Sequence, residues 1–341
     1  MENPTLVLLS RRGHDSVDPE CWEALQRNAR VIAVRRIRAP DAIEAAKLLA
    51  DADLLGATNA CLPTVNEALL DKLPRLRGIV LYATGYDHLD VDLLKSRDVG
   101  LSVVPDYATI AVAEHALAML LGLATRLHLA NDRSRGLCDP QTSLRGVELA
   151  GKNLGVIGLG HIGRRVARLG GALGMRVAGT DIDQVATLRA RANGVRTGGL
   201  GWLLRRSHAV VVCASQTYNR SPIVGTHELG LLPPAALLVN VARAALVDTV
   251  AATTAIRSGG LRGYAVDDTV LDPVVDGDLL TEGRVLQTGH SGWWRDEVLA
   301  RGARMWGQRL LAAVRDRPLD AVTWPSRETR ARSVPTGGTK V

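Results

Sequence analysis

Short apolar runs alternate with longer mixed segments over the first hundred residues of the chain. The runs have the length and the Val, Leu and Ile content of buried strands, whereas the segments between them have helical spacing. Strands are expected at residues 5–10, 31–34, 54–57, 78–82 and 101–104. Helices are expected at residues 19–28, 41–52, 64–73 and 91–96. Strands that alternate with helices in this way predict a parallel α/β sheet.

The same alternation returns in a second region after residue 150. Strands are expected at residues 154–157, 176–179, 209–213, 236–240, 262–266 and 284–287. Helices are expected at residues 164–173, 185–192, 200–205 and 249–258. One long apolar helix at residues 111–127 and a polar, irregular segment at residues 131–149 precede this region, and helical residues 295–314 follow it. A second parallel sheet is therefore expected, covered by helices on both faces.

These patterns predict two α/β domains of different size. Residues 106–291 form a complete doubly wound domain, which is inserted into a smaller domain made of residues 1–105 and completed by residues 292–325. The last residues, 326–341, are rich in Ser, Thr, Pro, Gly and Arg, and we expect them to be disordered.

Composition narrows the classes of function. The 341 residues carry a net charge of +7, but the Arg residues are scattered and no recognition motif accompanies them, so we expect no nucleic-acid partner. No apolar run reaches the roughly 18 to 20 residues of a membrane span. The N-terminus lacks the basic region of a secretory signal, and the four cysteines show neither disulfide nor metal spacing. We expect a cytoplasmic protein with no metal and no membrane contact, whose positive charge attracts a small anionic substrate.

A glycine turn follows the first strand of the second region. Gly158, Gly160 and Gly163 form G-x-G-x-x-G, and a second strand runs into Asp181, which lies 23 residues after Gly158. The first glycine permits the tight turn, the second lets a pyrophosphate approach the backbone, and the third lets helix and strand pack closely. His161 and Ile162 belong to the same turn, where the helix N-terminus offers N–H groups to phosphates. The spacing indicates a dinucleotide site rather than a merely structural βαβ unit.

Asp181 favours NAD over NADP as the dinucleotide. It is placed to accept hydrogen bonds from the adenosine ribose hydroxyls, and its carboxylate would repel a 2′-phosphate. The next residues are Ile182 and Asp183, so no Arg follows directly.

Several further blocks resemble the D-isomer-specific 2-hydroxyacid dehydrogenase family in order and spacing. The matching landmarks span residues 78–292 and include Thr84-Gly85-Tyr86-Asp87-His88-Leu89-Asp90, Val112-Ala113-Glu114-His115, Asn240-Val241-Ala242-Arg243, Gly263-Tyr264-Ala265-Val266-Asp267, Asp272-Pro273 and Thr288-Gly289-His290. The resemblance implies two Rossmann-like domains, with the NAD-binding domain inserted into a flavodoxin-like substrate domain. It also implies a homodimer, whose contact would be the apolar helix at residues 111–123 and the arm to residue 149.

The resemblance assigns three catalytic roles. Arg243 matches the residue that binds the substrate carboxylate, a role suited to the planar fork of a guanidinium. His290 matches the histidine that moves the proton, and an imidazole titrates near neutral pH. Asp272 occupies the position of the acid that pairs with this histidine, where the family usually has Glu. Asp is one methylene shorter, which puts its reach in question.

Two further assignments concern binding. Asp267 and Asp268 both compete with Asp272 as the acid partner, and Asp267 also matches a family residue near the nicotinamide carboxamide. Thr84 and Gly85 resemble the loop whose backbone N–H groups bind the substrate carboxylate in the family. A Lys at position 84 would add a positive charge to this loop, and Thr84 does not.

The chain also departs from the family pattern around the catalytic residues. Ala244 replaces a Gly after the Arg, Gly289 replaces a Pro before the His, and Trp293 and Trp294 follow closely. These two tryptophans either reshape the pocket or pack at a domain interface.

The expected activity is hydride transfer between NAD(H) and a small 2-hydroxy or 2-oxo acid. Two alternatives stay open. One is oxidation of a phosphorus-containing anion, since Gly85-Tyr86-Asp87 and Val104-Pro105-Asp106 loosely resemble phosphite dehydrogenase, although Thr84 argues against it. The other is a non-enzymatic NAD-sensing protein of the corepressor type, which retention of Arg243, Asp272 and His290 disfavours.

Overall fold

The chain divides into two compact units in the computed structural model, which describes residues 3–216 and 221–325. One unit combines Met1–Tyr107 with Asp296–Val341, and the other is Ala108–Arg295. The sequence placed the same divisions after residues 105 and 291. The tail expected to be disordered, residues 326–341, lies outside the described residues.

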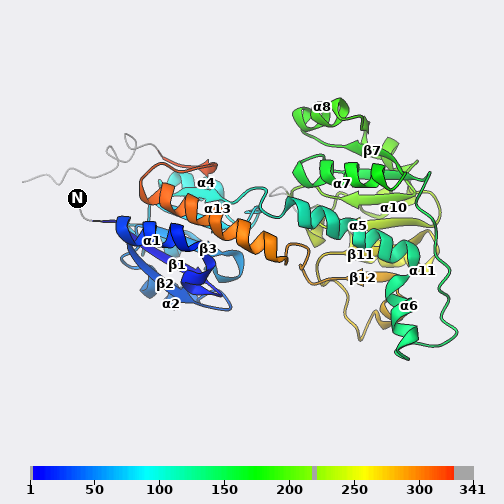
Figure 1. The fold of residues 1–341 in the computed structure, drawn as a ribbon, viewed down its shortest axis with the longest axis horizontal. Helices are drawn as coiled ribbons and strands as arrows, with labels where there is room; N and C mark the ends of the chain where they lie inside the picture. The colour runs from blue at the N-terminus through cyan, green and yellow to red at the C-terminus, as the bar shows by residue number, and fades with distance from the viewer. Residues whose placement is uncertain (1–2, 217–220, 326–341) are drawn as a thin grey trace, which may run out of the picture. The chain divides into compact units, whose positions relative to one another are not determined.

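The first unit contains a six-stranded sheet in the order β13-β5-β4-β3-β1-β2 (Figure 1). Its strands are β1 (Thr5–Ser10), β2 (Arg30–Arg35), β3 (Leu54–Thr58), β4 (Gly78–Tyr82), β5 (Gly100–Val103) and β13 (Ala321–Thr323). The first five strands run parallel, and β13 pairs antiparallel with β5. The parallel order 2-1-3-4-5 is that of flavodoxin-like folds, which confirms the predicted fold class.

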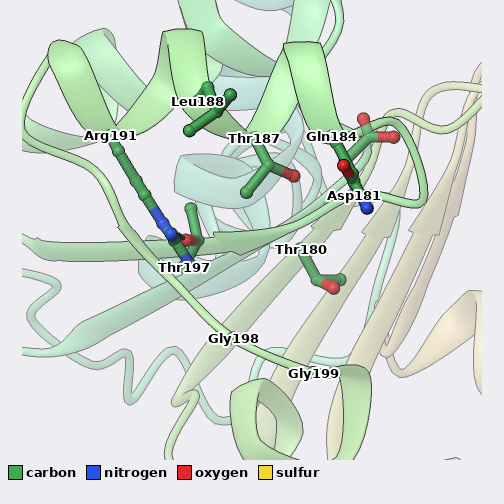
Figure 2. Close-up of a pocket in the computed structure, with 9 residues that line it drawn as sticks. All are labelled: Thr180, Asp181, Gln184, Thr187, Leu188, Arg191, Thr197, Gly198 and Gly199. Carbon is green, nitrogen blue, oxygen red and sulfur yellow. Dashed lines mark hydrogen bonds between the residues drawn. The ribbon is translucent and has the colours of Figure 1, made fainter.

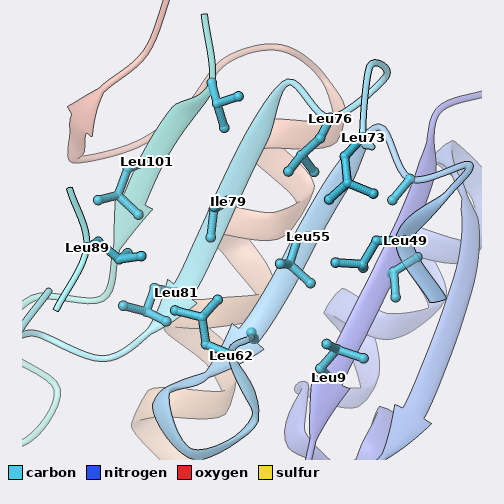
Figure 3. Packing of buried hydrophobic residues seen from close by; sticks show 14 of the residues in the cluster. Leu9, Leu49, Leu55, Leu62, Leu73, Leu76, Ile79, Leu81, Leu89 and Leu101 are labelled. Atoms are coloured by element: carbon cyan, nitrogen blue, oxygen red, sulfur yellow. The ribbon is translucent and has the colours of Figure 1, made fainter. Parts of the chain in front are cut away.

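Helices cover both faces of this sheet. They are η1 (Gly13–Ser16), α1 (Pro19–Asn28), α2 (Ala42–Leu49), η2 (Asn59–Cys61), α3 (Glu67–Leu70), α4 (Val91–Ser96) and α13 (Asp296–Val314). On one face Leu55, Ile79 and Leu101 pack against leucines of the connecting segments (Figure 3). On the other face Trp306 of α13 is fully buried and donates a hydrogen bond from Nε1 to the Val80 carbonyl at 3.0 Å.

The second unit begins with α5 (Thr109–Thr125) and α6 (Leu127–Ser134) and then forms a seven-stranded parallel sheet. The sheet order is β12-β11-β10-β9-β6-β7-β8. Its strands are β6 (Asn153–Ile157), β7 (Arg176–Thr180), β8 (Arg196–Thr197), β9 (Ala209–Val212), β10 (Ala236–Asn240), β11 (Leu261–Val266) and β12 (Val285–Gln287). Counted within the unit, this is the Rossmann order 3-2-1-4-5-6 with one further strand. The order reverses between β6 and β9, where such folds bind ligands.

The remaining helices of the second unit flank its sheet. They are α7 (His161–Ala172), α8 (Gln184–Ala192), α9 (Leu200–Leu204), α10 (Thr226–Gly230), η3 (Ala244–Leu246), α11 (Thr249–Arg257) and α12 (Gly277–Thr281). Among the described residues, no single helix is long and apolar enough to cross a membrane. The bent pair α5 and α6 reaches that length and composition only jointly, a property that buried core helices share.

Some expected elements differ from the structure. The segment 131–149 was expected to be irregular, but its first four residues are helical because α6 extends to Ser134. The helix expected at residues 64–73 is a single turn, Glu67–Leu70, which Asn66 caps by accepting a hydrogen bond from the Leu69 N–H. The short elements β8, β13, α10 and α12 were not predicted, since two to five residues carry too little periodicity.

Candidate active site

The glycine turn lies where β6 meets β9. Gly158 directly follows β6 and has φ +91°, a conformation that favours glycine. A Cβ on Gly158 would lie 2.5 Å from the backbone nitrogen of Ala214, and one on Gly163 would lie 1.8 Å from the Gly158 carbonyl oxygen. Two of the three glycines are therefore required by close backbone packing.

Gly160 differs from the other two glycines, because the space beside it is where a dinucleotide would have to fit. A Cβ on Gly160 would meet nothing within 4 Å, so the space beside it is open. Gly160 precedes α7, which begins at His161 and Ile162, and it has no side chain to cap the first N–H groups of the helix. Open space in front of the positive end of a helix fits a pyrophosphate.

Asp181 follows β7 and is held by backbone hydrogen bonds. Its Oδ2 accepts from the Leu159 N–H at 2.5 Å and its Oδ1 accepts from the Asp183 N–H at 2.8 Å. Each carboxylate oxygen can accept more than one hydrogen bond, so capacity for ribose hydroxyls is left. The acid is thus fixed to the glycine turn on one side and to the start of α8 on the other.

A cavity of about 490 Å³ lies beside Asp181 (Figure 2). It is bounded by α8 and by the segment after β8. Its lining residues are Thr180, Asp181, Gln184, Thr187, Leu188, Arg191, Thr197, Gly198 and Gly199. The Arg191 guanidinium donates a hydrogen bond to the Thr197 hydroxyl across this cavity. The size and position suit the adenosine end of a dinucleotide.

Arg243 lies in a turn after the buried strand β10. The side chain of Asn240, which is 1% exposed, holds this turn. Asn240 donates from Nδ2 to the Arg243 carbonyl at 2.8 Å and accepts from the Ala242 N–H at 3.0 Å. The half-buried Arg243 side chain also donates to the Ala242 carbonyl at 3.0 Å. A rigid turn therefore carries the guanidinium at the carboxyl edge of the sheet.

His290 and Asp272 also follow strands of this sheet. His290 is exposed, three residues after β12, and has φ +60°. Asp272 is exposed, and its Oδ1 accepts from the Val274 N–H at 2.7 Å. Across residues 3–216 and 221–325, no hydrogen bond or ion pair joins the two side chains.

Asp267 lies directly after β11 and is only 8% exposed. Its carboxylate accepts from the Thr288 hydroxyl at 2.7 Å, from the Ser291 N–H at 2.8 Å and from the Gly292 N–H at 3.0 Å. Burial alone would raise the pKa of Asp267, but hydrogen bonds from His115, Thr288 and Ser291 outweigh it and lower the pKa from 3.8 to about 2. Asp267 is therefore an anion that holds the segment around His290.

Residues 117–292 match the family described as D-isomer specific 2-hydroxyacid dehydrogenase, NAD binding domain. The chain belongs to this family. Among curated relatives, D-3-phosphoglycerate dehydrogenase of Mycobacterium leprae is 32% identical over 76% of this chain and 49% of its own length. The glyoxylate reductase of Thermococcus gammatolerans is 31% identical over 67% of this chain and 70% of its own. The chain thus spans about half the length of the mycobacterial relative.

Solved structures of the family agree with this fold. D-lactate dehydrogenase from Aquifex aeolicus, determined with NAD and lactic acid, is 28% identical to this chain with a TM-score of 0.76. The match covers 94% of this chain and 100% of that one. The family and the glycine turn together make NAD the cofactor of this unit.

The loop expected to bind the substrate carboxylate, Thr84 and Gly85, lies in the first unit. Thr84 and Gly85 follow β4, and the Thr84 hydroxyl donates to the Val104 carbonyl at 3.1 Å. Their role in substrate binding stays a prediction. Trp293 and Trp294, which the sequence left open between pocket and interface, pack edge to face with ring centroids 4.9 Å apart.

Three residues of this site were missed by sequence reasoning. Asn240, Thr288 and His115 all stood in the family landmarks but received no role. A His in an apolar helix was the available signal, since buried polar groups need partners. Within the described part of the chain, no group of three or more His, Cys, Asp or Glu residues is arranged to hold a metal ion.

Proposed function

We propose that the protein is an NAD-dependent oxidoreductase that interconverts a small 2-oxo acid and the corresponding D-2-hydroxy acid. One observation supports this most strongly. The glycine turn after β6, Arg243 after β10 and His290 after β12 all follow strands that run parallel in one sheet. The carboxyl ends of parallel strands share one edge, so a dinucleotide, a cation for a carboxylate and an acid/base group converge there.

The chain's own residues then have distinct tasks. Arg243 binds the substrate carboxylate with two parallel hydrogen bonds. His290 donates a proton to the carbonyl oxygen during reduction and accepts it during oxidation. When bound, NADH supplies the hydride that reduces C2 of the substrate. Binding of the carboxylate orients the reacting carbon. Protonation neutralises the negative charge that develops on the carbonyl oxygen.

Asp272 is proposed as the partner of His290, and Asp267 as a residue near the nicotinamide carboxamide. Because Asp272 Oδ1 accepts from Val274, its Oδ2 is the oxygen that would face the imidazole. That pairing requires the segment after Asp272 and the His290 ring to approach each other. We also propose that the protein forms a homodimer, through the exposed apolar side chains of α5 and α6.

The test is turnover of NADH with a panel of 2-oxo acids that includes glyoxylate and pyruvate, followed by the loss of reduced-nicotinamide absorbance. Replacement of His290 by Ala should lower kcat by a factor on the order of 100 or more, while NADH binding is retained. The control is His227→Ala, which removes an exposed histidine of α10 and should leave turnover unchanged. NADH binding without turnover on any 2-oxo acid would favour the NAD-sensing alternative. Unchanged turnover in His290→Ala would reject His290 as the acid/base.

A further inference from the structure

A chain of four polar side chains runs through the second unit beside His290. It links Arg295, His115, Thr288 and Asp267. His115 lies on α5 and its side chain is 11% exposed. Its Nε2 is 3.0 Å from Thr288 Oγ1 and 3.5 Å from Asp267 Oδ1, and its Nδ1 is 3.4 Å from Arg295 Nη2. Residues far apart in sequence therefore meet in one network.

The donors and acceptors of this network have one consistent assignment. The Thr288 hydroxyl donates its only hydrogen to the Asp267 carboxylate, so its oxygen accepts from His115 Nε2. His115 Nδ1 is then the acceptor and receives a hydrogen from the Arg295 guanidinium. Nε2 of His115 is therefore the ring nitrogen that faces Thr288 and Asp267, and Nδ1 is the one that faces Arg295.

The same carboxylate accepts hydrogen bonds from residues on both sides of His290 in the chain. Asp267 accepts from Thr288, two residues before His290, and from Ser291 and Gly292, the two residues after it. His290 itself has φ +60°, which is uncommon for a residue with a side chain and persists only where surrounding contacts hold it.

The backbone at Gly292 packs closely against Asp267 and His115. A Cβ on Gly292 would lie 2.7 Å from Asp267 Oδ2 and 3.1 Å from His115 Cδ2. The network and the backbone after His290 therefore fit against each other without spare room.

We propose that His115 is a positioning residue for His290, acting through Thr288 and Asp267 to fix the backbone conformation of residues 288–292. This inference rests on the proposed role of His290 as the acid/base. His115 orients the Thr288 hydroxyl toward the carboxylate, and the carboxylate holds the Ser291 and Gly292 N–H groups. An imidazole held in this way meets the substrate in one orientation, and small misplacements of a reacting group cost large factors in rate.

Two matched pairs of variants test the network. His115→Leu removes the donor, whereas His115→Gln keeps an N–H close to the place of Nε2. Thr288→Val removes the hydroxyl at nearly constant shape, whereas Thr288→Ser keeps it. We expect His115→Leu and Thr288→Val to lower kcat roughly 10-fold, with KM and the NADH Kd within about 2-fold of the wild type. His115→Gln and Thr288→Ser should retain most of kcat.

Amide hydrogen exchange of the whole protein provides a readout that does not depend on turnover. The Ser291 and Gly292 N–H groups should exchange roughly 10-fold faster in His115→Leu and Thr288→Val, because the carboxylate that accepts from them is less well held. The glycine-turn amides at residues 158–163 should exchange at the wild-type rate. If His115→Leu fails to fold, the nearly isosteric Thr288 pair decides the outcome.

The outcomes separate this inference from the proposed function. If His290→Ala loses activity while His115→Leu and Thr288→Val keep wild-type kcat and exchange rates, His115 has no positioning role and the proposed function stands. If His290→Ala keeps full turnover, His290 is not the acid/base, although the oxidoreductase activity itself stands. The amide exchange rates of Ser291 and Gly292 in His115→Leu and Thr288→Val then decide whether the network holds residues 288–292. Wild-type exchange rates in both variants would overturn the inference.

Discussion

Asp267 is a buried carboxylate whose stabilising effect depends on pH. Its pKa of about 2 lies below the ordinary 3.8, so the folded state favours the charged form. A lowered pKa contributes stability above pH 4, and that contribution is lost as the pH falls from 3.8 through about 2. The same hydrogen bonds that lower the pKa hold the segment around His290.

Replacing Asp267 by Asn should therefore destabilise the second unit by about 2 kcal/mol at pH 7, because a charged acceptor of buried N–H groups is lost. The difference from wild type should narrow by roughly half at pH 3. Urea unfolding at the two pH values measures both effects. The control is Asp268→Asn, since Asp268 Oδ1 accepts from the adjacent Thr269 N–H. A difference that is the same at both pH values would contradict the assigned charge state.

For single residues, the sequence predicted their place at the ends of strands better than their side-chain contacts. Arg243, Asp181 and His290 were identified by motif order, because each lies within three residues of the end of a strand of the second sheet. The contact of Asp272 with His290 does not follow from order. The pairing stays a prediction, and in the structure the short Asp side chain accepts from the N–H two residues along its own chain, a local turn that Asx residues commonly form. The network of His115 joins residues 173 positions apart and has no pattern in the sequence.

At the scale of elements, two of the three glycines of α7 differ in the space that an added Cβ would find. Gly163 packs against the glycine turn, where an added Cβ would lie 1.8 Å from the Gly158 carbonyl oxygen. Gly171 lies in the same helix, is exposed, and has nothing within 4 Å of an added Cβ. Helix propensity favours Ala at both positions, so packing alone distinguishes them.

Gly163→Ala should weaken NADH binding at least about 10-fold and destabilise the second unit by about 2 kcal/mol, because backbone must move. Gly171→Ala should leave NADH binding unchanged and stabilise the unit by up to about 1 kcal/mol. NADH titration by fluorescence and urea unfolding of both variants provide the comparison. Equal behaviour of the two variants would mean that the contact between α7 and the turn after β6 is not needed.

Long elements with strong periodicity were predictable, and short ones were not. The strands β1, β4 and β10 match their expected residues because continuous apolar runs allow few alternatives. The two-residue strand β8 and the antiparallel strand β13 exist only through pairing with a neighbouring strand. Such elements depend on tertiary contacts rather than on local pattern.

At the scale of the whole molecule, the sequence predicted two α/β units because strand and helix patterns occur twice. The chain connectivity also follows, since α13 returns to the first unit and Trp306 fills the second face of its sheet. The substrate cannot be predicted in the same way. Specificity depends on loop side chains, and no periodic pattern in the sequence determines the shape of loops.

The proposed homodimer leads to a prediction about α5, α6 and the segment after them. This part of the second unit has exposed apolar side chains, with Leu121 37%, Leu127 67% and Leu137 62% exposed. Exposed apolar surface is typical of an interface where it is contiguous. Light scattering after size-exclusion chromatography should give twice the 36.4 kDa mass of one chain.

The double variant Leu121→Glu/Leu127→Glu should shift the protein to monomer, because burying two carboxylates without partners costs more than such an interface supplies. The matched control is Val250→Glu on α11, an apolar side chain that is 75% exposed in the same unit and should not alter the mass. Both variants should keep the NADH affinity of the wild type, since neither site contains residues of the glycine turn or of the Asp181 cavity. A wild-type protein that elutes as a monomer, or a double variant that remains dimeric, would place the interface elsewhere. Because the substitutions lie on exposed positions, a change in mass without a change in urea midpoint would identify the apolar surface itself as the contact.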